Sequence, residues 1–189
     1  MDFLEQTSYV IFMEYVDVYT EAGDLSGERL LKSEVHQKGI WHKTVHVWIT
    51  DGLGNLLIQL RAPTKENCPN MWDISAAGHI SAGETAVQAA QRETQEELGL
   101  ELAEIQLQYL FTVKSSVVLN RGTYFDNEYN EVYIVLPPFN LEEIKLAANE
   151  VVEVKWISLL ELEDMINKKD PNLVSHPEEN ARLLEYLKR

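Results

Sequence analysis

Three glutamates near the middle of the chain have a spacing that suits chemistry on a charged substrate. Glu93, Glu96 and Glu97 stand at positions i, i+3 and i+4, so a helix would carry all three carboxylates on one face. Like charges at this spacing repel each other, whereas a bound Mg²⁺ would be stabilised by the same oxygens and by substrate phosphates. The spacing therefore indicates a metal site. The alternative interpretation is a solvated, glutamate-rich helix in an acidic protein.

A helix over residues 84–98 is expected to position these carboxylates. The segment contains neither glycine nor proline, is rich in alanine, and is followed by Gly99, a residue type that commonly ends helices. A stripe of smaller and apolar residues adjoins the carboxylates and should face the core; it consists of Val87, Ala90, Thr94 and Leu98. The carboxylates would then lie at the edge of a buried face.

Arg92 and two glycines before the helix support the same site. Arg92 precedes the carboxylates directly and can pair with a neighbouring one to hold it in register. Gly78 and Gly83 would let the preceding loop turn tightly and bring its backbone close to the metal.

The remaining pattern predicts runs of strands with few helices, which is typical of an α+β fold with a mixed sheet. The expected strands cover residues 9–18, 44–50, 56–61, 105–119, 130–136 and 151–157. The expected later helices cover residues 159–168 and 178–188, and the expected loops cover 62–70 and 120–127. We interpret residues 1–189 as one domain, with residues 1–8 disordered and the C-terminal helix within 177–189.

Composition limits the classes of partner. The chain has 189 residues, a net charge of −15 and one cysteine, Cys68. A single cysteine excludes an internal disulfide, and the acidity argues against nucleic acid and anionic membranes as partners. Neither a signal peptide nor an apolar run of membrane-spanning length is evident, so we expect a cytoplasmic protein whose ligand is a small molecule.

The glutamates belong to a longer pattern, which runs Gly78-x5-Glu84-x7-Arg92-Glu93-x2-Glu96-Glu97-x-Gly99. This pattern resembles the Nudix box, the metal-binding motif of the Nudix hydrolases, and residues 78–99 are called the box below. The resemblance implies an α/β/α sandwich around a mixed sheet, with the box as loop, helix and loop. It also implies Mg²⁺ or Mn²⁺ and hydrolysis of a diphosphate linked to another group.

The same resemblance implies roles for individual residues. Glu93, Glu96 and Glu97 would be metal ligands, and one of them, or a carboxylate of another loop, would be the general base. The carbonyl of Ala77 would be an extra ligand, and Gly78, Gly83, Glu84, Arg92 and Gly99 would be structural. A further metal ligand is expected outside the box, at Glu131 or alternatively at Glu128.

Residues 36–84 also resemble isopentenyl-diphosphate isomerase, which has a Nudix fold but does not hydrolyse its substrate. The resemblance implies that Arg61 and Lys65 bind the diphosphate, and that His79 contacts phosphate or metal. His36, His42 and His79 resemble the metal-binding histidines of the isomerase. Ala77, however, stands where the isomerase has its catalytic cysteine, so the thiol that allylic isomerisation needs is missing.

Three hypotheses follow. The first is a Mg²⁺-dependent hydrolase of a nucleoside diphosphate-type or related organic diphosphate, which the intact box favours. The second is an isomerase-like enzyme, and the third is a silent binding module on the same fold. The sequence leaves open the group attached to the diphosphate, the number of metals and the oligomeric state, with a homodimer as one alternative.

Overall fold

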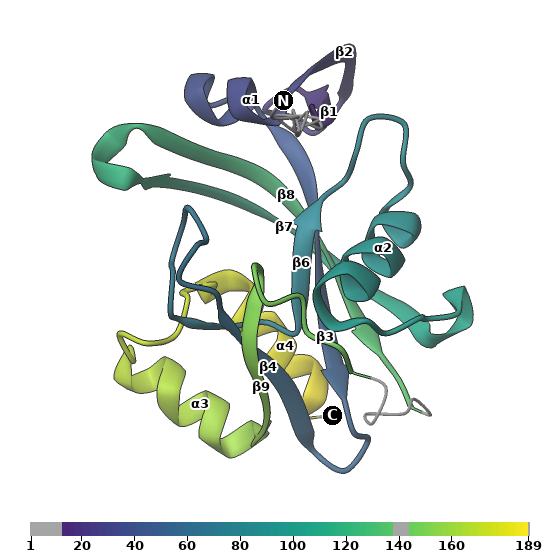
Figure 1. Ribbon diagram of the computed structural model, residues 1–189, viewed down its shortest axis with the longest axis vertical. Helices are drawn as coiled ribbons and strands as arrows, with labels where there is room; N and C mark the ends of the chain where they lie inside the picture. The colour runs from purple at the N-terminus through teal and green to yellow at the C-terminus, as the bar shows by residue number, and fades with distance from the viewer. Residues whose placement is uncertain (1–12, 138–143, 189) are drawn as a thin grey trace, which may run out of the picture.

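The computed structural model describes residues 13–137 and 144–188, and its central element is a seven-stranded mixed sheet (Figure 1). Strand β3 (His42–Thr50) lies in its centre and pairs with β8 (Tyr124–Val135) in parallel and with β6 (Ala76–His79) antiparallel. The other members are β4 (Asn55–Arg61), β5 (Trp72–Asp73), β7 (Leu107–Leu119) and β9 (Val151–Ser158).

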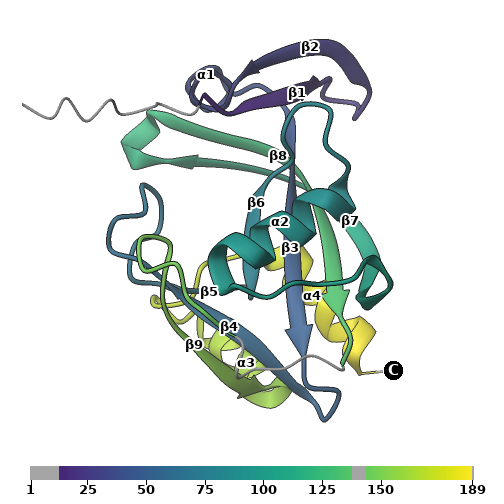
Figure 2. The same cartoon turned by 45° about the vertical axis from the view of Figure 1, so that its right-hand side comes forward.

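Helices cover both faces of this sheet, which confirms the predicted α/β/α sandwich (Figure 2). One face packs against α2 (Ala86–Leu98), through side chains such as Val45 and Val47 of β3 and Ala90 of the helix. The other face packs against α3 (Leu159–Lys168) and α4 (Pro177–Leu187), through Trp48, Leu162 and Leu183.

The helix that carries the box begins two residues later than predicted. Thr85 forms a capping box with Gln88, so residues 84 and 85 precede the helix instead of belonging to it. Gly99 ends the helix in the left-handed conformation at φ 70°, as its position predicted.

The predicted strands and the hairpin of β3 and β4 are present, with two departures. Strand β8 begins at Tyr124, inside the segment expected to be a loop, because residues 124–127 continue the antiparallel register with β7. The predicted strand 9–18 overlaps β1 (Tyr15–Tyr19), but the sequence analysis missed its antiparallel partner β2 (Leu25–Leu31) and the helix α1 (Lys32–Lys38). The N-terminal part of the predicted strand 9–18 and the predicted disorder of residues 1–8 lie outside the described residues. None of the helices within 13–137 and 144–188 is long and apolar enough to cross a membrane.

Two polar contacts dock α4 against the sheet. His176, just before the helix, contacts Asp73 at 2.8 Å between Nε2 and Oδ1. Glu179, in its first turn, accepts hydrogen bonds from His46 at 2.6 Å and from the indole N–H of Trp48 at 2.7 Å. The C-terminal helix therefore closes one face of the sheet through charge as well as through Leu183.

We expect the His176–Asp73 pair to make the unfolding free energy fall as the pH rises from neutral to alkaline values. Burial alone would lower the pKa of His176, but the Asp73 carboxylate outweighs it and raises this pKa to about 9. A raised histidine pKa stabilises the fold below about pH 6.5 and loses that contribution as pH rises through 9, an effect on the order of 2–3 kcal/mol. Unfolding free energies measured by urea denaturation between pH 6.5 and 9 should fall for the wild type and change much less for His176→Gln. Equal slopes for the two proteins would contradict the assignment.

Candidate active site

Helix α2 brings Glu93, Glu96 and Glu97 to one open cavity, whose volume is about 1660 Å³. Glu97 is only 3% exposed, the side chain of Glu93 is largely buried at 12% exposure, and Glu96 is exposed at the rim. The gradient follows from the helical spacing, because Glu97 lies nearest to the buried stripe that Ala90, Thr94 and Leu98 form. The stripe and the carboxylates thus occupy the positions that the sequence predicted.

The Glu97 carboxylate is fixed by donors from two strands. Its Oε2 atom accepts hydrogen bonds from the amide nitrogen of Gln59 on β4, at 2.9 Å, and from the backbone N–H of Ala77 on β6, at 3.1 Å. Its Oε1 atom lies 3.6 Å from the ammonium of Lys65. Burial nevertheless raises the pKa of Glu97, because these partners do not fully offset the loss of solvation.

Glu93 lies directly over Gly78. A Cβ atom built on Gly78 would stand 2.0 Å from the carboxyl carbon of Glu93, so any side chain at this position would displace the glutamate. The sequence analysis attributed Gly78 to a tight turn, but its backbone is in a strand and it is the close approach of Glu93 that requires glycine. Burial, opposed by Arg92, raises the pKa of Glu93 to about 7.

Arg92 connects the loop and the helix of the box. Its guanidinium binds both carboxylate oxygens of Glu84 at 2.9 Å, and also Glu93 at 2.6 Å and Glu96 at 3.1 Å. It further donates to the carbonyl of His79 at 2.8 Å. Burial alone would raise the pKa of Glu84, but hydrogen bonds from Arg92 and from the backbone N–H of Ser81 lower it. Arg92 and Glu84 therefore connect the loop, the helix and β6.

These carboxylates fit a hard divalent cation. Burial raises the pKa values of two of them, Glu93 and Glu97, and a bound cation would offset the solvation that these carboxylates lose. Oxygen donors of this kind are the ligands of Mg²⁺ and Mn²⁺. Ala77 lines the same cavity, and the role of its carbonyl as a metal ligand stays a prediction.

This cavity is also lined by the three residues that were predicted to bind the substrate, which are Arg61, Lys65 and His79. Arg61 holds the loop that follows β4: it donates to the Asn67 carbonyl at 3.0 Å and to Asp73 at 3.0 Å. Lys65 is shared between Glu97 and Glu150. Their positive charges are thus already matched by carboxylates of the chain.

The structure does not bring Glu131 to the cavity. Residues alternate between the two faces of β8, so Glu128 and Asn130 line the cavity while Glu131 pairs with Lys43 away from it. The alternative, Glu128, is therefore the candidate ligand outside the box. The sequence analysis preferred Glu131 because it assigned the start of β8, where Glu128 lies, to a loop.

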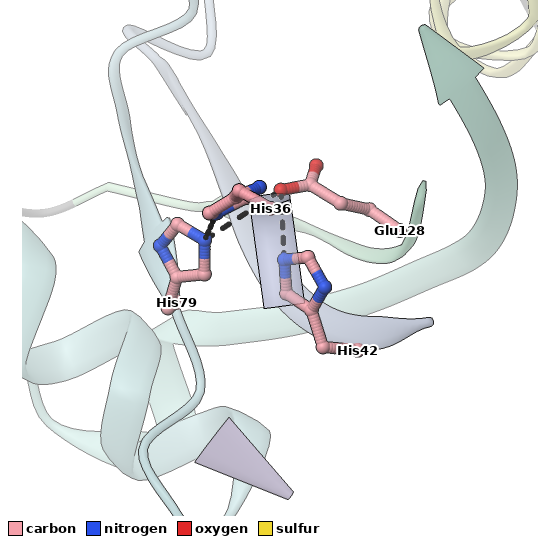
Figure 3. Close-up of side chains that lie close together, drawn as sticks. All are labelled: His36, His42, His79 and Glu128. Carbon is pink, nitrogen blue, oxygen red and sulfur yellow. Dashed lines mark hydrogen bonds and ion pairs between the residues drawn. The ribbon is translucent and has the colours of Figure 1, made fainter. Parts of the chain in front are cut away.

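Glu128 joins three histidines in a second cluster (Figure 3). His36 comes from α1, His42 from β3 and His79 from β6, and one ligand atom of each residue lies within 4.8 Å of the others. The Nε2 atoms of His36 and His79 are 2.9 Å apart, and Nε2 of His42 lies 3.4 Å from Glu128 Oε1. All four residues are buried or nearly so, and the structure thus unites the histidines that resemble the isomerase's metal-binding set.

The protonation pattern of this cluster suits a cation. The Nδ1 atom of His42 donates to the carbonyl of Ile40 at 2.9 Å, which turns its Nε2 atom toward the Glu128 carboxylate. Within the described residues that buried Nε2 has no hydrogen-bond partner. Burial and the neighbouring His42 lower the pKa of His36 to about 4, and burial lowers the pKa of His79, so both rings are neutral at pH 7. Three imidazoles and one carboxylate are a donor set for Zn²⁺, Mn²⁺, Fe²⁺ or Co²⁺.

Comparison with known proteins places this geometry in a family. The family model for the NUDIX domain matches residues 40–176. Nudix hydrolase 3 of Arabidopsis thaliana is 41% identical over 166 residues, which are 86% of this chain but only 22% of that protein. Isopentenyl-diphosphate Delta-isomerase 2 of Photorhabdus laumondii is 34% identical over 138 residues, 72% of this chain and 73% of that one. Among solved structures, DR0079 of Deinococcus radiodurans has a TM-score of 0.65 at 20% identity and covers 93% of this chain and 100% of its own.

The contact of Glu93 with Gly78 predicts a stability effect that a second substitution should reverse. Gly78→Ala forces a Cβ into the glutamate and should lower the unfolding free energy by about 1–3 kcal/mol, the usual cost of overpacking. Gly78→Ala with Glu93→Ala removes the clashing carboxylate and should recover most of that loss. Chemical denaturation of the two variants, with Glu93→Ala as control, measures the coupling; purely additive effects would show that the two residues do not touch.

The two clusters should bind metals independently. Co²⁺ titration of the wild type should give an absorption spectrum from the histidine cluster, and Mn²⁺ titration should also detect the box. His42→Asn should abolish the Co²⁺ spectrum and leave a Mn²⁺ site, whereas Glu97→Gln should retain the spectrum and weaken Mn²⁺ binding. Retention of the Co²⁺ spectrum in His42→Asn would exclude the histidine cluster as the ligand set.

Proposed function

Because the chain belongs to the NUDIX domain family, we propose that it is a Mg²⁺-dependent pyrophosphohydrolase that cleaves the diphosphate linkage of a nucleoside diphosphate-type or related organic diphosphate. The observation that carries the proposal is the pair of buried carboxylates, Glu93 and Glu97, facing the cavity with their pKa values raised. The chain spans about a fifth of the length of the Arabidopsis relative, so the proposal concerns this chain alone.

The charge balance of the cavity supports a requirement for metal. A diphosphate brings two or more negative charges, while Arg61 is bound by Asp73, Lys65 by Glu97 and Glu150, and Arg92 by the box. A bound divalent cation would neutralise the bridging phosphates and lower the pKa of an attacking water. Glu93, Glu96 and Glu97 would hold that cation, and we propose Mg²⁺ or Mn²⁺ for it.

Other residues would position the substrate and the box. Lys65 reaches Glu97 from the loop after β4, so its ammonium can contact a phosphate that lies against the same carboxylate. Arg92 keeps Glu93 and Glu96 beside Glu84, and Gln59 keeps one oxygen of Glu97 turned toward the sheet. The oxygen of the attacking water would bond to one phosphorus while the bond from that phosphorus to the bridging oxygen breaks. The proton of the water would pass to a box carboxylate, and the other phosphate group would leave into the open cavity.

The histidine cluster favours a second candidate, an isomerase-like enzyme. His36, His42 and His79 lie together with Glu128, whereas the resemblance favoured Glu131 as the carboxylate, and the Photorhabdus isomerase is 34% identical. Ala77 argues against isomerase activity, because its methyl group cannot donate or accept the proton that is transferred in allylic isomerisation. We therefore propose hydrolysis, with the histidine cluster as an additional metal site of the same cavity.

A panel of nucleoside and isoprenoid diphosphates with Mg²⁺ tests the function. Release of phosphate or of a monophosphate is expected, and it should disappear with EDTA and return with added Mg²⁺. Glu97→Gln should lower kcat by several orders of magnitude while the unfolding free energy stays the same or rises, since a buried charge is removed.

The products separate the alternatives. Rearrangement of the carbon skeleton without phosphate release would establish the isomerase. Binding without any turnover would leave a silent module. Near wild-type activity in Glu97→Gln would refute the metal-site assignment, and a Glu153→Gln variant at an exposed position of β9 provides a matched surface control.

A further inference from the structure

Gln59 is a buried polar residue that neither the box nor its resemblance to known families explains. It lies on β4, is 1% exposed, and is not among the residues that line the cavity. Its neighbours along the strand, Leu57 and Ile58, are core residues. An amide at such a position is costly unless all its polar atoms are paired.

Only one end of this amide is paired in the described part of the chain. The nitrogen, Nε2, donates to Glu97 Oε2 at 2.9 Å, whereas the buried oxygen, Oε1, has no hydrogen-bond partner there. Rotating the amide would not help, because its oxygen would then face the carboxylate of Glu97. The contact with Glu97 therefore fixes the orientation of the amide and leaves the oxygen unsatisfied.

These contacts fix the orientation of the Glu97 carboxylate. Oε2 is bound by Gln59 from β4 and by the N–H of Ala77 from β6, so the carboxylate plane is held by two strands. Oε1 is left on the side of Lys65. A carboxylate held in this way presents one chosen oxygen and loses little rotational freedom when it binds a ligand.

We propose that Gln59 is a positioning residue for the metal site, which orients Glu97 so that Oε1 faces the cation, at the expense of an unsatisfied oxygen in the core. The proposal rests on the function proposed above, in which Glu97 is a metal ligand. If Gln59 positions Glu97, removal of the amide should weaken metal binding without lowering the stability of the fold. A purely structural role would predict the opposite pattern.

Gln59→Met tests this directly, because methionine has a similar length and volume and carries no amide. Mn²⁺ affinity, measured by electron paramagnetic resonance of the free ion, should fall about tenfold or more, the usual effect of removing a partner of a metal ligand. The Tm should stay the same or rise by a few degrees, since the unsatisfied oxygen goes too. A fall in Tm with unchanged Mn²⁺ affinity would overturn the proposal.

Ser75→Ala is the matched control. Ser75 is fully buried beside the same strands, but its hydroxyl donates to the Leu57 carbonyl and accepts from the Ile49 N–H, and it touches no box carboxylate in the hydrogen bonds described. This variant should lower Tm and keep the Mn²⁺ affinity. Gln59→Asn, which keeps the amide but shortens its reach, should lose Mn²⁺ affinity as Gln59→Met does, and it serves if the methionine variant does not fold.

A double variant separates this proposal from the proposed function. In a Glu97→Gln background, Gln59→Met should cause no further loss of Mn²⁺ affinity, because its route to the metal is already gone. A full additional loss would show that Gln59 acts elsewhere and would overturn its role. Wild-type Mn²⁺ affinity in Glu97→Gln alone would instead refute the metal site itself, whatever Gln59 does.

Discussion

The site depends on the burial of negative charge against a strand. Glu93 and Glu97 lie at the edge of the core because the stripe that adjoins them on α2 packs against the sheet. Ionised carboxylates in such a place are unfavourable unless cations or hydrogen-bond donors offset the lost solvation. The surrounding residues supply part of this offset, and the shortfall is visible in the raised pKa values of both groups.

The cationic side chains at the cavity are shared among several carboxylates, so they offset only part of the solvation that Glu93 and Glu97 lose. Arg92 contacts Glu84, Glu93 and Glu96, so its single charge is divided among three carboxylates. Lys65 is divided between Glu97 and Glu150, and Arg61 serves Asp73. This distribution fixes the geometry of the box without neutralising it, which is the state in which an added divalent cation gains most.

The sequence allowed the box and most of the sheet to be predicted because both rest on local patterns. The helical spacing of the glutamates, the alternation of residues 44–50 and Gly99 after the helix each involve neighbours in the chain. The Glu97 contacts with Gln59 and Ala77 join residues 38 and 20 positions apart, and no local pattern indicates them. The preference for Glu131 over Glu128 failed for a related reason: it depended on where β8 begins, and pairing with β7 extends the strand into a polar segment.

Strand β6 connects the two candidate metal clusters through three consecutive residues. Ala77 donates its N–H to Glu97, Gly78 makes room for Glu93, and His79 belongs to the histidine cluster. The carbonyl of His79 also accepts a hydrogen bond from Arg92, so the main chain between the clusters is held by the box itself. Because β6 is paired with β3 over its whole length, from Ala76 to His79, the strand cannot shift at one cluster without shifting at the other. The fold thus sets the separation of the two clusters by backbone pairing.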